Sequence, residues 1–372
     1  MIRLATLIET FEAQFLAQYG HALLSSQRQA LAAMKGCRTS ASPLMQATCS
    51  ECDHHAFVPH SCGHRACPHC QHHESQQWLE RQLQKQVNAE YFLLTFTLPA
   101  ELRALAWSHQ RTVYDRMCRC SWETVRTFTA NDRQFQGRAG AISVLHTHSR
   151  RLDYHPHVHL VMPAAAIDEE RKCLRTKKGR KGQGGYLFNH KALAKVFRAK
   201  LLDALTRAGL ALPPGCPDAW VVDAKSVGNG EKALVYLGRY LYRGVIQEKD
   251  ILACENGQVT FRYRNAKTRR TERRTLPGPE FLALILRHVL PKGLRRARNF
   301  GFLHPNSKRL IALLQYLTGF DPKRALAAIK PRPPFTCPCC GAVMEIVKTR
   351  IPRRLARALP VPLPQGQEAP VM

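Results

Sequence analysis

Two pairs of cysteines near the N-terminus constrain the fold more than any other feature of this chain. Cys49 and Cys52 form one pair, Cys67 and Cys70 form the other, and fourteen residues separate the two pairs. Two Cys-x2-Cys hooks at such a separation supply four thiolates to one tetrahedral zinc ion. We therefore predict that these four cysteines hold a structural Zn²⁺. Cys62 or a neighbouring histidine could replace one of them or contribute to a second site, and the alternative without metal is four ordinary buried cysteines.

A third pair with the same spacing, Cys337 and Cys340, lies near the C-terminus and has the form of half a zinc ribbon. No further pair follows it, and Cys37 and the other remaining cysteines are isolated or unsuited as its partners. The pair is therefore part of a zinc site, the remnant of a knuckle, or a contact in a dimer.

The charge of the chain points to a polyanionic partner. Lysine and arginine number 56 against 27 acidic residues, a formal net charge of +29, and 45% of the 372 residues are hydrophobic, as in a globular protein. The excess is concentrated in residues 261–300, which carry twelve basic residues and two acids. We expect nucleic acid as the partner, although a generally basic protein or one that coats an anionic membrane would show a similar balance. The phosphate contacts are expected from Arg269, Arg270, Arg273 and Arg274.

No apolar run approaches the ~20 residues that span a bilayer, and Glu9 comes too early for a signal peptide. We therefore expect a cytoplasmic protein without a membrane partner. In a reducing compartment, fourteen cysteines favour metal binding over disulfides.

The hydrophobic patterns predict an α+β protein with a largely antiparallel sheet. Residues 168–185 are charged and rich in glycine, and we expect them to form a mobile loop. The expected helices are two within 5–35, then 74–89, 101–130, 190–209, 230–243, 279–290 and 306–328, and the expected strands are 91–99, 141–148, 156–162, 220–224, 258–264 and 269–276.

A histidine pair marks a candidate catalytic metal site. His157 and His159 flank one valine in a strand pattern, so both imidazoles point to the same face of a sheet. Two imidazoles seldom hold a catalytic divalent ion, so a third ligand is needed. His146, on the preceding strand, is our choice, with His148 or an acid or amide from elsewhere as rivals and His155 in reserve. The alternative is a polar strand edge in a chain with many histidines.

Two tyrosines four residues apart are candidate nucleophiles. Tyr236 and Tyr240 lie on one face of a predicted helix, and Leu234, Leu237 and Leu241 offer a separate apolar stripe. Aromatic residues at helical spacing usually fill a core, which is the rival interpretation. A divalent metal beside tyrosine nucleophiles can cut and rejoin DNA through a phosphotyrosine.

Together these motifs give the chain its resemblance to the two-tyrosine HUH-endonuclease transposases of the IS91 insertion-sequence family, over about residues 5–330. The segments that carry the resemblance are Cys62–Gln71, Phe96–Leu102, Val144–Thr147, His155–His159 and Tyr236–Leu241.

The resemblance implies an HUH-endonuclease core, a central antiparallel sheet flanked by helices, preceded by a helical and zinc-ribbon module. It implies a transposase that works in a rolling-circle-like manner on single-stranded DNA of the element's ends and target, in a bacterial cytoplasm and on the nucleoid when acting. His157 and His159 match the family's ligands for Mg²⁺ or Mn²⁺, and Tyr236 and Tyr240 match its nucleophiles. His148 stands where relatives commonly have an aromatic residue, so the choice between His146 and His148 stays open.

We expect four parts: a helical entry with the zinc-binding domain over 1–90, the catalytic domain over 91–330, the half zinc ribbon over 331–352, and a Pro-rich disordered tail over 353–372. Two other functions fit the same motifs. One is a plasmid replication initiator or relaxase with the same chemistry, and the other is a zinc-containing DNA-binding regulator without catalysis. Nothing in the sequence names a protein partner.

Overall fold

A computed structural model describes residues 2–171, 173–177, 187–242, 244–265, 268–327 and 334–353, and at positions 239, 240, 242, 325 and 327 it describes the backbone alone. Except for Arg353, the predicted tail lies outside these residues, as does most of the second half of the predicted mobile loop. None of the helices in the described ranges is both long and apolar enough to cross a bilayer.

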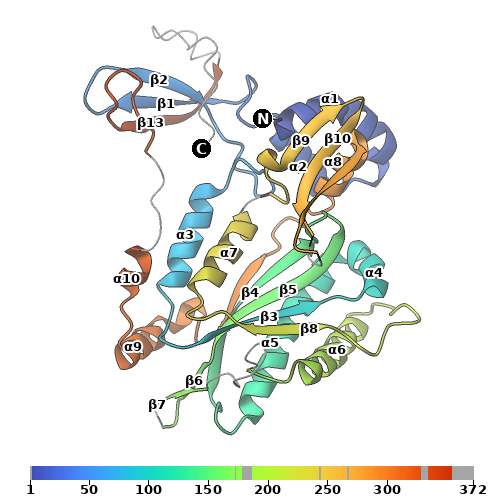
Figure 1. The fold of residues 1–372 in the computed structure, drawn as a ribbon, viewed down its shortest axis with the longest axis vertical. Coiled ribbons are helices and arrows are strands. Elements are labelled where there is room, and N and C mark those ends of the chain that lie inside the picture. The colour runs from blue at the N-terminus through green and yellow to red at the C-terminus, as the bar shows by residue number, and fades with distance from the viewer. Residues whose placement is uncertain are drawn as a thin grey trace.

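A seven-stranded antiparallel sheet forms the centre of the protein (Figure 1), which confirms the predicted α+β class. The strand order is β7-β6-β4-β5-β3-β8, and β12 pairs with β4 outside this path. The two strands expected to be antiparallel neighbours, β4 and β5, pair along most of their length. The strands are β3 (Tyr91–Thr97), β4 (Arg138–His148), β5 (Tyr154–Pro163), β6 (Ala165–Asp168), β7 (Cys173–Thr176), β8 (Val222–Ser226) and β12 (Ala297–Gly301).

Three helices cover one face of this sheet. They are α4 (Arg103–Ser108), α5 (Gln110–Asn131) and α6 (His190–Arg207). Side chains alternate along a strand, so Phe92, Leu94 and Phe96 of β3 all point to this face, where they share one core with α5 and α6. The ring of Phe96 packs against Phe197 of α6, with centroids 4.9 Å apart.

Two helices cover the opposite face, where Figure 1 shows them side by side. They are α3 (His72–Leu83) and α7 (Glu231–Tyr242). The apolar stripe of α7, with Leu234 and Leu237 fully buried, packs with strand residues such as Val161. A Cβ at Gly238 would lie 3.3 Å from the ring of Trp78 on α3, so the absence of a side chain lets the two helices approach closely. This packing fixes α7 over the centre of the sheet.

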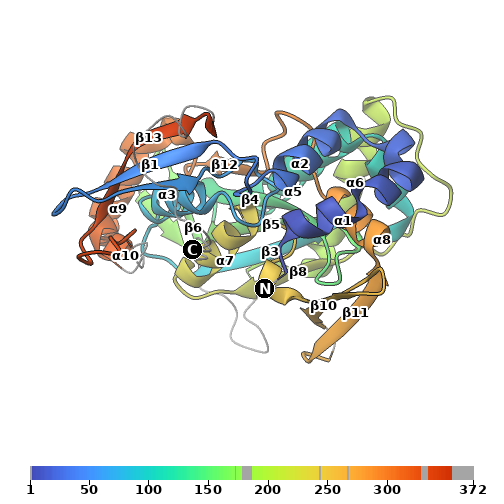
Figure 2. The ribbon, with the colours of Figure 1, turned by 90° about the horizontal axis from the view of Figure 1, so that it is seen from above.

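The N-terminal helices pack against a segment that follows far later in the chain. Phe11 and Phe15 of the first helix share a core with Phe261 and Phe281. Figure 2 shows α1 and α2 above the sheet and the β10–β11 hairpin at the edge of the molecule. The elements are α1 (Leu4–Tyr19), α2 (Ser25–Lys35), β9 (Ile251–Glu255), β10 (Gln258–Arg264), β11 (Thr271–Pro277) and α8 (Gly278–Leu286).

A third sheet joins the two ends of the described chain. Its strand order is β13-β1-β2, so a strand near the C-terminus pairs antiparallel with one near the N-terminus. No strand in this sheet was predicted. The strands are β1 (Leu44–Cys49), β2 (His55–Pro59) and β13 (Met344–Ile351).

The predicted elements differ from the observed ones at identifiable breaks. The helix expected over 101–130 divides at His109, whose backbone leaves the helical region, into α4 and α5. The helix expected over 306–328 is divided in two, α9 (Lys308–Thr318) and α10 (Pro322–Ala327). The first of them is capped by Gly319, which has a φ of 62°. Part of the predicted loop forms β7, and β12 was missed because only Ala297 and Phe300 among its residues are hydrophobic, so it shows no alternating strand pattern.

Gly301 at the end of β12 offers a test of the sheet. An added Cβ there would lie 1.7 Å from the carbonyl oxygen of Ala139, whereas at Gly257, which also has a positive φ, nothing lies within 4 Å. We expect Gly257→Ala to cost about 1–2 kcal/mol for its left-handed backbone. Gly301→Ala should cost on the order of 4 kcal/mol or more, because backbone must also move. Thermal unfolding monitored by circular dichroism compares the two variants, and equal midpoints would contradict this packing.

Candidate active site and metal centres

Three histidines meet on the face of the sheet that α7 covers. His146 on β4 lies directly opposite His157 on β5, and His159 follows two residues later on the same face. Their ring centroids are 4.5 Å (His146 to His159), 4.9 Å (His157 to His159) and 5.2 Å (His146 to His157) apart. One nitrogen of each ring lies within 4.8 Å of the others. The structure thus brings together the three residues that the sequence suggested.

Two of the rings are oriented by hydrogen bonds through Nδ1. His157 Nδ1 lies 2.7 Å from the carbonyl oxygen of His155, and because a carbonyl only accepts, Nδ1 carries the proton. The lone pair of His157 is therefore on Nε2. His159 Nδ1 lies 3.0 Å from the hydroxyl of Thr95, which is directly opposite on β3. Such contacts fix the orientation of metal-binding imidazoles in proteins.

Burial keeps the cluster neutral at physiological pH. Removal from water lowers the pKa of His157 to about 4 and the pKa of His159 to about 3, and it lowers the pKa of His146 well below its usual range. The neighbouring imidazoles add to the effect for His146 and His159, since two positive rings would repel. Metal binding requires neutral imidazole, so these three donors fit a divalent cation.

The other histidines proposed as ligands lie outside the cluster. The ring of His148 is 6.3 Å from that of His146 and packs at 5.3 Å from His288, on the side away from the pair. His155 Nδ1 accepts a hydrogen bond from Arg103 at 2.9 Å. The geometry therefore favours His146 as the third member.

Tyr236 lies beside the histidines. Its ring meets that of His159 nearly edge-on at 6.3 Å between centroids, and 37% of the residue is exposed. The leucine stripe of α7 fills the core instead, so Tyr236 does not serve the packing role that its spacing also allowed. The backbone of Tyr240 is one turn further along the same helix, but its side chain lies outside the described structure.

Two charged residues that the sequence did not single out lie on the same face of the sheet. Asp223 on β8 pairs with Thr95, which in turn pairs with His159, so the three side chains form one row across three strands. Lys225 follows on β8, and its charge contributes to the lowered pKa of His159. Both residues are exposed, whereas Val222 and Ala224 are buried. The alternation of charged and apolar residues along β8 is the sequence pattern from which the positions of Asp223 and Lys225 could have been predicted.

The prediction that Cys49, Cys52, Cys67 and Cys70 hold one zinc ion together is wrong, because the structure places the two pairs in different clusters. The pair of Cys67 and Cys70 instead lies beside Cys37, which follows the end of α2. Its Sγ lies 3.5 Å from that of Cys70 and 3.6 Å from that of Cys67. The full cluster is Cys37, Cys62, Cys67 and Cys70.

The pair of Cys49 and Cys52 lies at the turn of the β1–β2 hairpin, away from Cys67 and Cys70. Cys49 and Cys52 meet Cys337 and Cys340 in a second cluster of four thiols. The half ribbon near the C-terminus therefore has a partner pair, and that pair precedes it by almost three hundred residues.

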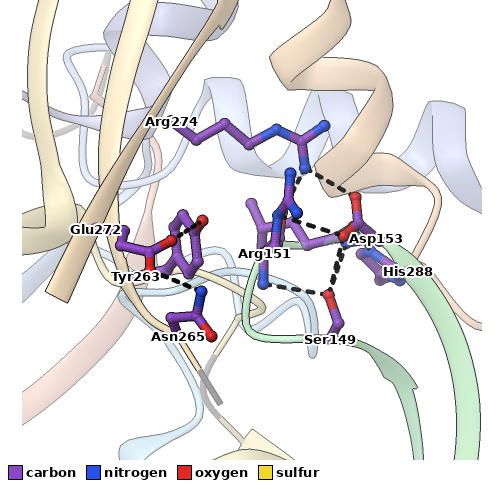
Figure 3. Close-up of polar contacts among 9 residues, drawn as sticks. Ser149, Arg151, Asp153, Tyr263, Asn265, Glu272, Arg274 and His288 are labelled. Carbon is purple, nitrogen blue, oxygen red and sulfur yellow. Dashed lines mark hydrogen bonds and ion pairs between the residues drawn. The ribbon is translucent and has the colours of Figure 1, made fainter. Parts of the chain in front are cut away.

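The four arginines predicted to contact phosphate lie on the β10–β11 hairpin and differ in their surroundings. Arg269, Arg270 and Arg273 are exposed. Arg274 is instead held by the turn between β4 and β5, where its Nη1 contacts Asp153 Oδ1 and the carbonyl oxygen of Arg151, both at 2.8 Å (Figure 3). Arg274 therefore connects the hairpin to the strands that carry the histidines.

A second basic surface was not predicted. A cavity of about 1230 Å³ lies between α3, α5, β12 and the loop around Arg65, and among the described residues nine lysines and arginines line it against one acid, Asp115. Burial and the charges of Arg81 and Lys308 lower the pKa of Lys85 on this wall. Arg295, Arg296 and Arg298 belong to the basic concentration over 261–300, whereas the other six lie between Arg65 and Arg119, so no single run of charge revealed the surface.

Comparison with known proteins places the chain among transposases. The family described as "Putative transposase" matches residues 140–310, and the family described as "Transposase zinc-binding domain" matches residues 7–98. "Putative transposase y4qJ" of Sinorhizobium fredii (strain NBRC 101917 / NGR234) is 31% identical over 78% of this chain and 79% of its own length. "Transposase for insertion sequence element IS801" of Pseudomonas savastanoi pv. phaseolicola is 28% identical over 84% and 81%.

Among solved structures, TrwC complexed with a 27-mer DNA comprising the recognition hairpin and the cleavage site is similar over 62% of this chain and 74% of that chain. The sequence identity is 14% and the TM-score is 0.26.

The contact between Thr95 and His159 gives a test of the histidine cluster as a metal site. Thr95→Val keeps the shape of the side chain and removes its hydroxyl, so we expect Mn²⁺ to bind about 10–100-fold more weakly. Thr97→Val is the matched control, because Thr97 lies opposite His157, whose ring is held by the backbone instead. Calorimetric titration with Mn²⁺ measures both. Equal affinities in the two variants would show that Thr95 does not support a bound metal.

Proposed function

Because the chain belongs to the IS91 family of transposases, we propose that it nicks and rejoins single-stranded DNA through 5′-phosphotyrosine intermediates in rolling-circle-like transposition. The observation that carries the proposal is the position of Tyr236 beside His159, in a cluster of three neutral histidines of which His146 and His159 are buried. Replication initiators and relaxases share this chemistry, but the two relatives described above are transposases by name.

His146, His157 and His159 would hold the catalytic divalent cation. When bound, the cation withdraws charge from a non-bridging oxygen of the scissile phosphate and so stabilises the transition state. A set of three imidazoles suits Mn²⁺ better than Mg²⁺, which prefers oxygen ligands. Among the described residues no carboxylate joins the cluster, so the donors that would hold the cation are three neutral imidazoles.

Tyr236 performs the first transfer. Its phenolic oxygen attacks phosphorus, the bond from phosphorus to the 3′ oxygen of the preceding nucleotide breaks, and that oxygen leaves as a free 3′-OH. The phenol gives up its proton to solvent, and the 3′ oxygen takes one up. A phenol with a pKa near 10 needs nearby positive charge to react, and Lys225 contributes such charge on this face. The phosphotyrosine keeps the energy of the phosphodiester, so rejoining requires no nucleoside triphosphate.

Tyr240 is the second nucleophile in this proposal. Its backbone lies one helical turn from that of Tyr236 on α7. Two tyrosines at one metal centre allow donor and target strands to be linked at the same time and then exchanged.

We assign a structural Zn²⁺ to the cluster of Cys37, Cys62, Cys67 and Cys70, which lies within the part of the chain that matches the zinc-binding family. A tetrahedral ion with Zn–S bonds of about 2.3 Å separates its sulfurs by about 3.8 Å, close to the spacing here.

The zinc loop supports the catalytic helix. Arg65, between two of the ligands, donates hydrogen bonds to the carbonyl oxygens of Leu290, Pro291 and Leu294. Gly244, just after α7, approaches so closely that an added Cβ would lie 2.8 Å from the carbonyl oxygen of Ala66. Zinc would thereby hold the end of the tyrosine helix.

DNA would contact two basic surfaces. The exposed arginines at the tip of the β10–β11 hairpin form one, and the cavity lined by Arg81 and Lys85 forms the other. The unbalanced charge in the cavity is costly without an anion, and a phosphate backbone supplies one. Arg274 keeps the hairpin fixed relative to the histidines and is not counted among the phosphate contacts.

Substitution of the tyrosines separates their roles. Phenylalanine keeps the ring and removes the hydroxyl, so folding should survive. We expect Tyr236→Phe and Tyr240→Phe each to retain adduct with one strand, the double variant to form none, and transposition to fail in all three. The measurement is SDS-resistant adduct with labelled single-stranded DNA, and Tyr242→Phe serves as control. Normal transposition by Tyr240→Phe would make this a one-tyrosine enzyme.

The salt dependence of DNA binding tests the two basic surfaces. Neutralising two phosphate contacts should reduce the slope of log affinity against log salt by about 1.4 for single strands. We expect this change for Arg269→Gln with Arg270→Gln, and again for Arg81→Gln with Lys85→Gln. Lys191→Gln with Lys195→Gln is the control, because both are exposed on α6 and line neither surface. The control variant should leave the slope unchanged. If the double variant on one of the two basic surfaces also leaves it unchanged, that surface does not bind phosphate.

A further inference from the structure

The cysteines at the two ends of the described chain form a cluster with the geometry of a metal site. Cys49 Sγ lies 3.4 Å from Cys340 Sγ, and Cys52 Sγ lies 3.7 Å from Cys337 Sγ and 3.6 Å from Cys340 Sγ. A disulfide requires about 2.05 Å, whereas sulfurs around one tetrahedral zinc are about 3.8 Å apart. The four thiols therefore have the spacing of ligands to one ion and not of two disulfides.

The strands around this cluster complete a zinc ribbon. Cys49 ends β1 and Cys52 lies in the turn before β2, while Cys337 and Cys340 lie in the turn that precedes β13. β13 pairs with β1, and β1 pairs with β2, so two knuckles and three strands come from opposite ends of the chain. Hydrogen bonds between the two turns support the arrangement, because Ser50 donates to the carbonyl oxygen of Val343 through both its backbone nitrogen and its hydroxyl.

We propose that Cys49, Cys52, Cys337 and Cys340 bind a second structural Zn²⁺, which closes a zinc ribbon divided between the N- and C-terminal parts of the chain. The ligand is a soft, thiophilic divalent cation, and four thiolates in tetrahedral arrangement select zinc. This ion is separate from the one assigned to the cluster of Cys37, with which it shares no ligand. The proposal does not depend on the catalytic function.

The packing around the ribbon explains why a metal is needed. The buried hydrophobic residues around the cluster are few, namely Ala47 and Met344 together with two of the cysteines. Along β13 the six residues from Glu345 to Arg350 are exposed, so its side chains bury little apolar surface. A core this small does not offset the entropy of ordering a distant segment, whereas a structural zinc contributes its binding free energy directly to folding. Zinc would thus hold residues 334–353 on the N-terminal sheet.

A metal count on the full-length protein tests the proposal. We expect two zinc ions per chain, and one in the double variant Cys337→Ser with Cys340→Ser. The matched control is Cys339→Ser with Cys173→Ser, because both residues are exposed and belong to neither cluster. This control should keep two ions. Mass spectrometry of the metal content measures the count, and cobalt substitution reports tetrathiolate coordination through its absorption spectrum.

Hydrogen exchange provides a second readout that does not depend on stoichiometry. In the Cys337→Ser, Cys340→Ser variant we expect amide exchange across β13 and β1 to increase, while that of β4 and β5 stays as in the unchanged protein. A zinc count in the unchanged protein no higher than in the Cys337→Ser, Cys340→Ser variant would overturn the proposal. Two zinc ions in the double variant, or the loss of one in the control, would also overturn it.

Discussion

The pairing of β4 with β5 is the constraint on which the rest of the structure depends. Its register places His146 directly opposite His157, and the pleat then places His159 on the same face. A shift by one residue would turn His157 and His159 toward α5 and α6 and would turn Val158 and Leu160 toward α3 and α7. Because both faces of the sheet are covered, burial on each side specifies this register strongly.

The same burial determines the chemistry of the cluster. The chain carries a net charge of +29, yet its three central histidines are kept neutral because a charged imidazole would lose its hydration. Histidines in an unfolded chain have a pKa near 6.5, so unfolding takes up protons below that pH. This contribution to stability is fully present above about pH 6.5 and is lost as pH falls toward the lowered values of about 4 for His157 and about 3 for His159. Metal affinity should likewise decrease as the pH falls, because metal binding requires neutral imidazole rings.

Residues that act through local spacing could be predicted from the sequence. Alternation on a strand identified His157 and His159, and the helical repeat separated Tyr236 from the leucines that fill the core. The zinc ligands could not be assigned in the same way, since Cys49 meets Cys340 only because β1 and β13 pair across almost the whole chain. Two Cys-x2-Cys hooks at a ribbon-like separation predicted one site, although each hook clusters with cysteines from other parts of the chain. The ion pair of Arg274 with Asp153 could not be predicted either, because it forms only when the β10–β11 hairpin packs against the turn between β4 and β5.

The central claim is that a tyrosine of α7 becomes covalently linked to DNA at the histidine cluster. Its most direct test is to incubate the unchanged protein with single-stranded DNA carrying the element's ends, with Mn²⁺ or with a chelator, and to identify the nucleotide-bearing peptide by tandem mass spectrometry. The account predicts an adduct that requires Mn²⁺, with the phosphate on Tyr236 or Tyr240. The absence of any adduct, or an adduct on a residue outside α7, would contradict it.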